Sequence, residues 1–238
     1  MGGKSDIDLL KDGKRIDGRK PKELRPVKIE AGVLEQADGS AYIEVGGTHA
    51  IVGVIGPRVM HPRHLIEPTK AVLRMRYDMM PFSVDDRKRP GPDRRSREIG
   101  KVTRQALESV IPLEKYPKTV IDVFMEILQS DGGTRVTGLT GASVALADAG
   151  IEMTDMVASC AAGKIGGEVV LDLCGKEDNY GQADVPIAYT QNDDRITMLQ
   201  MDGLLTKKEF EKAVDYAVYG CKELHKLQKK ALKERYKE

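Results

Sequence analysis

The chain has 238 residues, of which 40% are hydrophobic and 32% charged, a length that allows one large domain or two small ones with a sizeable core. Lys and Arg (38) nearly balance Asp and Glu (37), so a protein that is basic over its whole surface is excluded and any nucleic-acid site must be local. No apolar run is long enough for a membrane span, and the first residues lack the apolar core of a signal peptide. We therefore expect a cytoplasmic protein with no membrane partner.

The cysteines and histidines point to no redox or metal chemistry. Cys160, Cys174 and Cys221 are too few and too scattered for a disulfide scaffold, and no pair has the spacing of metal ligands. The four histidines form no HxxxH pattern, and neither a nucleophile elbow nor a Walker loop is present. We expect buried thiols and no covalent nucleophilic catalysis.

The first part of the chain changes from polar to β-rich. Residues 1–26 carry eight Lys or Arg, which predicts an arm that packs only in part. Short β-branched runs at 27–30, 41–45 and 50–55, separated by turn residues, predict hairpin strands. Residues 71–77 alternate in polarity, as in a half-buried strand.

The middle of the chain alternates helices with strands. Two prolines and a glycine predict a loop over 85–97, and apolar residues at helical spacing predict a helix from Ile99 to Ile111. Residues 119–128 are nearly all apolar, which predicts a strand buried on both faces. A glycine-rich turn at 131–135 then leads into a helix of small residues at 139–149.

The last part of the chain predicts four more strands and a closing helix, at 156–162, 168–173, 183–189, 195–201 and 206–237. This order predicts an α/β (α+β) domain with mixed sheets. We divide it into the arm at 1–26, a first half at 27–150, and a second half at 151–238 that includes the C-terminal helix.

Two features suit a phosphate ligand. The basic loop contains Arg87, Lys88, Arg89, Arg94, Arg95 and Arg97. Arginine forks match phosphate oxygens, although a solvated loop or a subunit contact explains such a loop equally well. The second feature is the turn Gly132, Gly133, Thr134 and Arg135, which could bind an anion at a helix N-terminus; a plain turn between a strand and a helix is the alternative.

A pair of acids is the third feature. Asp178 follows the second-half strand at 168–173, and Asp184 begins the next strand. Together they could hold Mg²⁺ or Mn²⁺, and Asp178 could instead act as a general acid; taken alone, these residues fit ordinary turn chemistry better. All three features together are what phosphoryl transfer on nucleic acid requires. If orthophosphate is the attacking group, no histidine base is needed, because it is already largely dianionic.

Several motifs in this order resemble the RNase PH family. They are Arg15-Ile16-Asp17-Gly18-Arg19, Leu24-Arg25-Pro26, Gly39-Ser40-Ala41, Arg94-Arg95, Asp131 to Arg135 with Thr140-Gly141-Ala142, and Glu177-Asp178 with Asp184. The resemblance runs from Arg15 to about Asp202, most of the chain. Within the family the chain looks most like the catalytic RNase PH-like subunit of the archaeal exosome, because of its segments at 60–67, 79–83 and 178–181.

The resemblance implies an RNase PH-like fold and a phosphorolytic 3′→5′ exoribonuclease. Such an enzyme degrades single-stranded RNA with inorganic phosphate as co-substrate, releases nucleoside diphosphates, and in reverse extends 3′ ends. By resemblance, the turn from Gly132 to Arg135 binds the phosphate. Asp178 and Asp184 carry the catalytic acid and the Mg²⁺ (or Mn²⁺) site. Arginines of the set Arg94, Arg95 and Arg97 grip the RNA, and which two do so stays open.

The resemblance also implies partners. It suggests a hexameric ring, a trimer of heterodimers with a related inactive RNase PH-like subunit, and cap proteins that bind RNA. Arg63 and His64, in the loop 60–64, are candidates to line the pore, although a plain surface loop is nearly as well supported. Two alternatives remain: a non-catalytic RNA-binding ring subunit, which should lack Thr134-Arg135 or the acidic pair, and a homohexameric RNase PH that trims tRNA 3′ ends.

Overall fold

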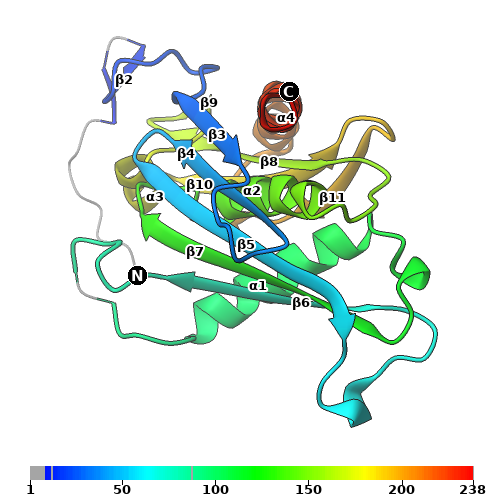
Figure 1. Cartoon of the computed structure of the whole chain (residues 1–238). Helices are drawn as coiled ribbons and strands as arrows, with labels where there is room; N and C mark the ends of the chain where they lie inside the picture. The colour runs from blue at the N-terminus through cyan, green and yellow to red at the C-terminus, as the bar shows by residue number, and fades with distance from the viewer. Residues whose placement is uncertain (1–8, 12, 87, 238) are drawn as a thin grey trace.

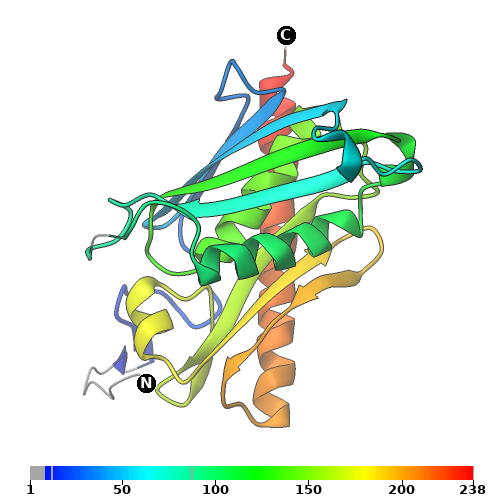
Figure 2. The same cartoon turned by 90° about the horizontal axis from the view of Figure 1, so that it is seen from below.

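The computed structural model describes residues 9–11, 13–86 and 88–237, arranged as two five-stranded sheets with two helices between them (Figure 1). Residues 1–8 of the predicted arm and Arg87 of the basic loop lie outside the described residues. Turned by 90°, the same fold shows the first sheet above these helices and the second sheet below them (Figure 2). The fold class predicted from the sequence is confirmed.

The first sheet is mixed. Its strands are β3 (Val27–Ala31), β4 (Gly39–Val45), β5 (Thr48–Val59), β6 (Val72–Met79) and β7 (Thr119–Gln129), in the order β3-β4-β5-β7-β6. Only β6 and β7 pair in parallel, and helix α1 (Arg94–Glu108) connects them along the chain. Strand β7 lies between β5 and β6. One face of β7 is buried, whereas Phe124, Glu126 and Leu128 on the other face are only half-buried, so the prediction of a strand buried on both faces was wrong.

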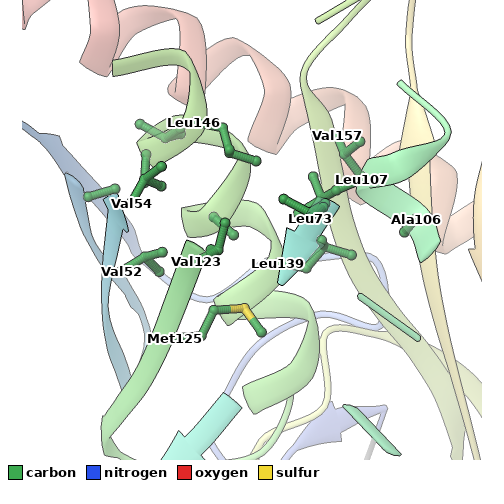
Figure 3. Packing of buried hydrophobic residues seen from close by; sticks show 14 of the residues in the cluster. Val52, Val54, Leu73, Ala106, Leu107, Val123, Met125, Leu139, Leu146 and Val157 are labelled. Carbon is green, nitrogen blue, oxygen red and sulfur yellow. The ribbon is translucent and has the colours of Figure 1, made fainter. Parts of the chain in front are cut away.

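Helix α2 (Thr134–Asp148) is buried on almost every side, because it packs against both sheets. Its small residues allow this close approach: a Cβ on Gly141 would lie 2.9 Å from the Ile43 side chain. Figure 3 shows part of the resulting core, with Leu139 and Leu146 of α2 beside residues of β5 and α1. Each such leucine contributes about 1.5–3 kcal/mol when fully buried.

The second sheet is antiparallel. It contains β8 (Val157–Ile165), β9 (Glu168–Leu171), β10 (Ala183–Thr190), β11 (Arg195–Leu199) and β12 (Asp202–Gly203), in the order β11-β10-β8-β9 with β12 paired to β10. Helix α4 (Lys207–Arg235) packs on this sheet through Ala217, Cys221 and Leu224, which meet Cys160 of β8. The remaining elements are β1 (Leu10–Lys11), β2 (Lys14–Arg15), α3 (Gly175–Tyr180) and two 3₁₀ turns, η1 (Arg63–Leu65) and η2 (Leu113–Lys115).

Two helices begin earlier than predicted. Helix α1 starts at Arg94 rather than near Ile99, because the Asp93 carboxylate caps it by accepting from the Ser96 amide at 2.6 Å. Arg94, Arg95 and Arg97, which were expected in a loop, are therefore in the first helical turn. Helix α2 starts at Thr134 rather than at Leu139, so that Thr134 and Arg135 belong to the helix itself.

One further expectation was wrong, because Asp178 lies in the short helix α3 rather than in a turn. In the arm, Arg15, Arg19 and Arg25 are at most 8% exposed, whereas residues 16–18 between them are exposed, so this segment packs against the fold in part. Within the described part of the chain, no helix combines the length and the apolar character needed to cross a bilayer.

Candidate active site

A cavity of about 550 Å³ lies where the start of α2, helix α3 and the beginning of β10 meet. It brings together most of the predicted site residues: Arg95, Gly133, Thr134, Arg135, Asp178 and Asp184. A second cavity of about 550 Å³ adjoins it, shares Arg95, Thr134 and Asp178, and includes Gly132. The three sequence features thus face one continuous depression.

The glycine turn has a backbone that other residues would strain. Gly132 and Gly133 have φ values of +75° and +64°, in the left-handed region. A Cβ on Gly132 would come within 2.8 Å of the Leu173 carbonyl oxygen, just before α3. The turn is held by Thr48, whose hydroxyl donates to the Gly132 carbonyl at 2.7 Å. Because the first amides of a helix lack intrahelical acceptors, this turn presents N–H groups and the positive end of α2 to the cavity.

The two side chains that follow the glycines are each held by a neighbour. Thr134 Oγ1 accepts a hydrogen bond from the Tyr77 hydroxyl of β6 at 2.8 Å. The Arg135 guanidinium donates to Glu98 of α1 at 3.1 Å and also to Gln200. Gln200 in turn donates to Glu98 at 2.9 Å, which closes a triangle around the arginine. Arg135 Nε is buried and has no hydrogen-bond partner among the described residues.

Three carboxylates line the opposite wall. Asp202 of β12 pairs directly across from Asp184 of β10, which places both side chains on one face of the sheet. Burial, reinforced by Asp178 and Asp202, raises the pKa of Asp184 to about 7. Burial also raises the pKa of Asp178, against the opposing effect of Arg95 and Arg135. Asp184 can therefore carry a proton near neutral pH.

Arginines of the N-terminal arm fix the two loops behind the cavity. Arg15 forms a buried ion pair with Glu177, the neighbour of Asp178, with Nε 2.8 Å from Oε1. Arg25 donates to the Asp131 carbonyl at 2.5 Å and pairs with Asp172 at 2.7 Å. The segment before β3 thus connects α3 to the glycine turn.

The predicted RNA-binding residues are not all in one place. Arg95 lines both cavities, whereas Arg94 and Arg97 line neither. Arg63 and His64 are exposed in η1, which follows the end of β5. That end pairs with the start of β7, whereas the glycine turn follows the last residue of β7, about 30 Å away along the strand. A role for Arg63 and His64 in a pore stays a prediction.

Sequence reasoning assigned no role to several residues that line or support the site. These are Tyr77, Glu98, Gln200 and Asp202, together with the arm residue Arg15. Arg15 belongs to a motif of the family resemblance, whereas the other four belong to no local motif with a chemical signature. The Asp93 cap, by contrast, could have been found, because Asp favours the N-cap position and Pro92 precedes it.

A divalent cation fits the charges of the cavity. Its lining carries two arginines against four carboxylates, an excess of negative charge that would repel a phosphate. Asp184 Oδ1 is buried and has no hydrogen-bond partner among the described residues. The same residues include no cluster of three or more His, Cys, Asp or Glu side chains arranged to hold a metal ion. One or two carboxylates completed by substrate oxygens and water is the environment that Mg²⁺ prefers.

Comparison with known proteins agrees with this geometry. The family model "3′ exoribonuclease family, domain 1" matches residues 23–152, and "domain 2" matches residues 155–220. The chain is 58% identical over 237 residues to "Exosome complex component Rrp41" of Thermococcus onnurineus, covering 99% of this chain and 95% of the relative. It is 53% identical over 238 residues to the protein of the same description from Nitrosopumilus maritimus, covering 99% and 98%.

Two solved structures share the fold. Rice Rrp46 superposes with a TM-score of 0.80 at 21% identity, covering 90% of this chain and 98% of that one. A chain of the Archaeoglobus fulgidus exosome with RNA bound to the active site superposes with a TM-score of 0.77 at 24% identity, covering 95% and 94%. The sequence matches span both halves of the chain, so the protein belongs to the 3′ exoribonuclease family of RNase PH proteins.

Proposed function

We infer that the protein is a phosphorolytic 3′→5′ exoribonuclease, the catalytic subunit of an exosome-type complex. One observation carries this conclusion: a single cavity has the N-terminus of α2, with Thr134 and Arg135, on one wall and Asp178 and Asp184 on another. Proteins 53–60% identical to the chain are exosome components. Both the chemistry of the cavity and the sequence similarity to exosome components therefore support this conclusion.

The glycine turn would bind and orient the attacking phosphate. The first amides of α2, the Thr134 hydroxyl and the Arg135 guanidinium all donate hydrogen bonds, which suits an anion that only accepts them. Orthophosphate is already ionised near neutral pH, so positioning contributes more to the rate than a base would. Arg95, at the junction of the two cavities, would neutralise a phosphate of the RNA end.

The reaction exchanges one phosphorus–oxygen bond for another. An oxygen of the free phosphate bonds to the phosphorus of the last linkage, and the bond to the 3′ oxygen of the preceding nucleotide breaks. The products are a nucleoside diphosphate and an RNA shorter by one nucleotide. The new 3′ hydroxyl needs one proton, which the Asp178 carboxyl can donate because its pKa is raised by burial. Phosphate replaces water, so the reaction is a phosphorolysis and not a hydrolysis.

Asp184, with Asp178 when it is ionised, would hold Mg²⁺ or Mn²⁺. The cation would supply positive charge against the oxygens of the transferred phosphoryl group. The unpartnered Oδ1 of Asp184 and the excess of carboxylates support this assignment. Asp202 adds negative charge beside Asp184.

For partners, we propose single-stranded RNA, a related inactive RNase PH-like subunit that alternates with this chain in a six-membered ring, and RNA-binding cap proteins. The exosome names of the relatives support a multi-subunit assembly. The cytoplasmic location expected from the sequence stays a prediction.

The decisive experiment measures nucleotide release by the assembled complex. A labelled oligo(A) is incubated with Mg²⁺ and with or without inorganic phosphate, and ADP is expected only when phosphate is present. Asp178→Asn should lower kcat by about 100-fold or more, because general acids contribute about that factor. Asp215→Asn, on the exposed side of α4, is the matched control. Release of AMP without phosphate would contradict the proposal.

Both alternative functions have their own test. A non-catalytic subunit would lack part of the site, whereas this chain keeps Thr134, Arg135 and both acids. If Asp178→Asn left RNA degradation intact, the non-catalytic alternative would gain support. Light scattering of the isolated chain distinguishes the exosome-type subunit from the second alternative. A stable homohexamer that is also active would favour a tRNA-trimming RNase PH.

A further inference from the structure

We propose that Tyr77 is a positioning residue for the attacking phosphate: its hydroxyl donates to Thr134 Oγ1 and so directs the Thr134 hydroxyl hydrogen into the cavity. Tyr77 itself lines neither cavity. The inference rests on the proposed function, since it takes the anion at the glycine turn to be the phosphate that cleaves RNA.

The contact is buried and short. Tyr77 lies on β6, opposite Met125 of β7, and is 2% exposed. Its hydroxyl oxygen is 2.8 Å from Thr134 Oγ1, and Thr134 is 4% exposed, although it lines both cavities. This hydrogen bond therefore connects β6 directly to the first residue of α2, in addition to the bond that Thr48 of β5 makes to Gly132.

The chemistry of the two hydroxyls sets the direction of this bond. Burial raises the pKa of Tyr77 above its usual value, so the phenol keeps its proton at any pH at which the enzyme would work. A threonine hydroxyl has one hydrogen to donate, and here its oxygen already accepts one. Thr134 is the first residue of α2, so no carbonyl one turn earlier in the helix competes for its hydrogen. The free hydrogen faces the cavity, where an anion can accept it.

Removing only the Tyr77 oxygen should weaken phosphate binding. In Tyr77→Phe the ring still fills its place, but the Thr134 hydroxyl can turn away from the cavity. We expect KM for phosphate to rise about 2- to 10-fold, the effect of one neutral hydrogen bond. At saturating phosphate, kcat and KM for RNA should stay within about 2-fold, because RNA does not depend on this hydrogen.

Two comparisons separate positioning from general damage to the sheet. Tyr42→Phe removes a hydroxyl from the same sheet, where it donates to Glu44 at 2.8 Å and lies 3.1 Å from His49 Nδ1. Tyr42 lines neither cavity, so KM for phosphate should stay unchanged. In a Thr134→Val background, Tyr77→Phe should raise KM for phosphate by a further factor of less than about 1.5, because the two residues act through one contact. Thr134→Ser, which keeps the hydroxyl, should raise KM for phosphate less than Thr134→Val does.

The outcomes can be told apart. If the unmodified complex releases no nucleoside diphosphate with phosphate, the proposed function fails and the role of Tyr77 falls with it. If the unmodified complex is active but Tyr77→Phe leaves KM for phosphate unchanged, only the present inference is overturned. The inference is also overturned if Tyr77→Phe raises KM for phosphate as much in the Thr134→Val background as in the unmodified enzyme. Should Tyr77→Phe not fold, equal phosphate KM values for Thr134→Ser and Thr134→Val would overturn the inference from the other partner of the contact.

Discussion

Arg15 and Glu177 form an ion pair in which both side chains are completely buried, although 162 positions separate them in the chain. Glu177 also accepts from the Cys174 amide at 3.0 Å and so caps its own helix. Asp178 is the next residue. The N-terminal segment thus contributes to the active site without entering the cavity.

Arg15→Met should destabilise the chain by about 3–5 kcal/mol, because it leaves the Glu177 carboxylate buried with only Arg19, 3.8 Å away, as a charged partner. Unfolding in urea measures this change. Lys115→Met is the control: Lys115 pairs with Glu152 on the surface, where both side chains are 56% exposed, and its loss should cost at most about 1 kcal/mol. Similar costs for the two variants would mean that the buried pair contributes no more than a surface pair.

Gly132→Ala should disrupt the phosphate turn by steric contact as well as by backbone strain. Gly150 provides the matched control, because its φ of +71° is close to the +75° of Gly132, yet a Cβ there would meet nothing within 4 Å. We expect Gly150→Ala to cost about 1–2 kcal/mol from its backbone conformation alone. Gly132→Ala should cost about 1–3 kcal/mol more, and also raise KM for phosphate, because the loop before α3 must move. Equal stability losses would contradict the close approach of the two loops.

The buried carboxyl of Asp184 makes the metal-free chain less stable as the pH rises. Its pKa is raised from 3.8 to about 7, so between these values the folded chain binds more protons than the unfolded chain. The Asp184 carboxyl therefore stabilises the folded chain fully below about pH 3.8, and this stabilisation is lost as the pH rises to about 7. In EDTA at about pH 8, Asp184→Asn should therefore be about 1–3 kcal/mol more stable than the unmodified chain, with no gain at about pH 4. Asp215→Asn, which removes an exposed carboxyl, is the control. A gain in Asp184→Asn that does not depend on pH would contradict the assignment.

The negative charge of Glu98 would repel the phosphate that Arg135 is positioned to bind. Glu98→Gln keeps an oxygen that can accept from Arg135 but removes one negative charge from the cavity. We expect KM for phosphate to fall by about 2- to 5-fold, a modest Coulomb effect at a partly exposed site. Glu108→Gln, in the last turn of the same helix where Glu108 pairs with Arg104 at 3.6 Å, is the control. A raised KM would show that the charge of Glu98 matters more for holding Arg135 than for repelling phosphate.

The strands of the first sheet and the glycine turn could be predicted from the sequence, because neighbouring residues determine them. The β-branched runs predicted the strands of the first sheet because alternation reports one buried face, and the glycines at 132 and 133 predicted a turn because few other residues adopt positive φ. The RNase PH fold and family followed from motifs in order, and both are confirmed. The grouping of the acids with the glycine turn was predicted from the chemistry that these features share and from that resemblance, not from a local pattern.

Contacts between distant segments account for what was missed. Helix α3 is six residues long and contains Gly, Asp and Asn, a composition typical of turns, and it is held by Arg15 from the far end of the chain. Asp202 joins the acids because β12 pairs with β10, and Glu98 reaches Arg135 because α1 lies between the sheets. Pattern reasoning has no access to such pairings until the topology is known.

The position of each arginine on α1 predicts which one binds RNA. Arg95 lines both cavities, whereas Arg97 lines neither and serves as its matched control. Arg95→Ala should raise KM for RNA about 10-fold, the effect of losing one charge-assisted contact, while Arg97→Ala should change it by less than about 2-fold. Arg95→Ala should also reduce the slope of log KM against log salt by about 0.7, as expected for one lost phosphate contact on a single strand. Equal effects of the two substitutions in the assembled complex would mean that RNA approaches along the outer side of α1 rather than through the cavity.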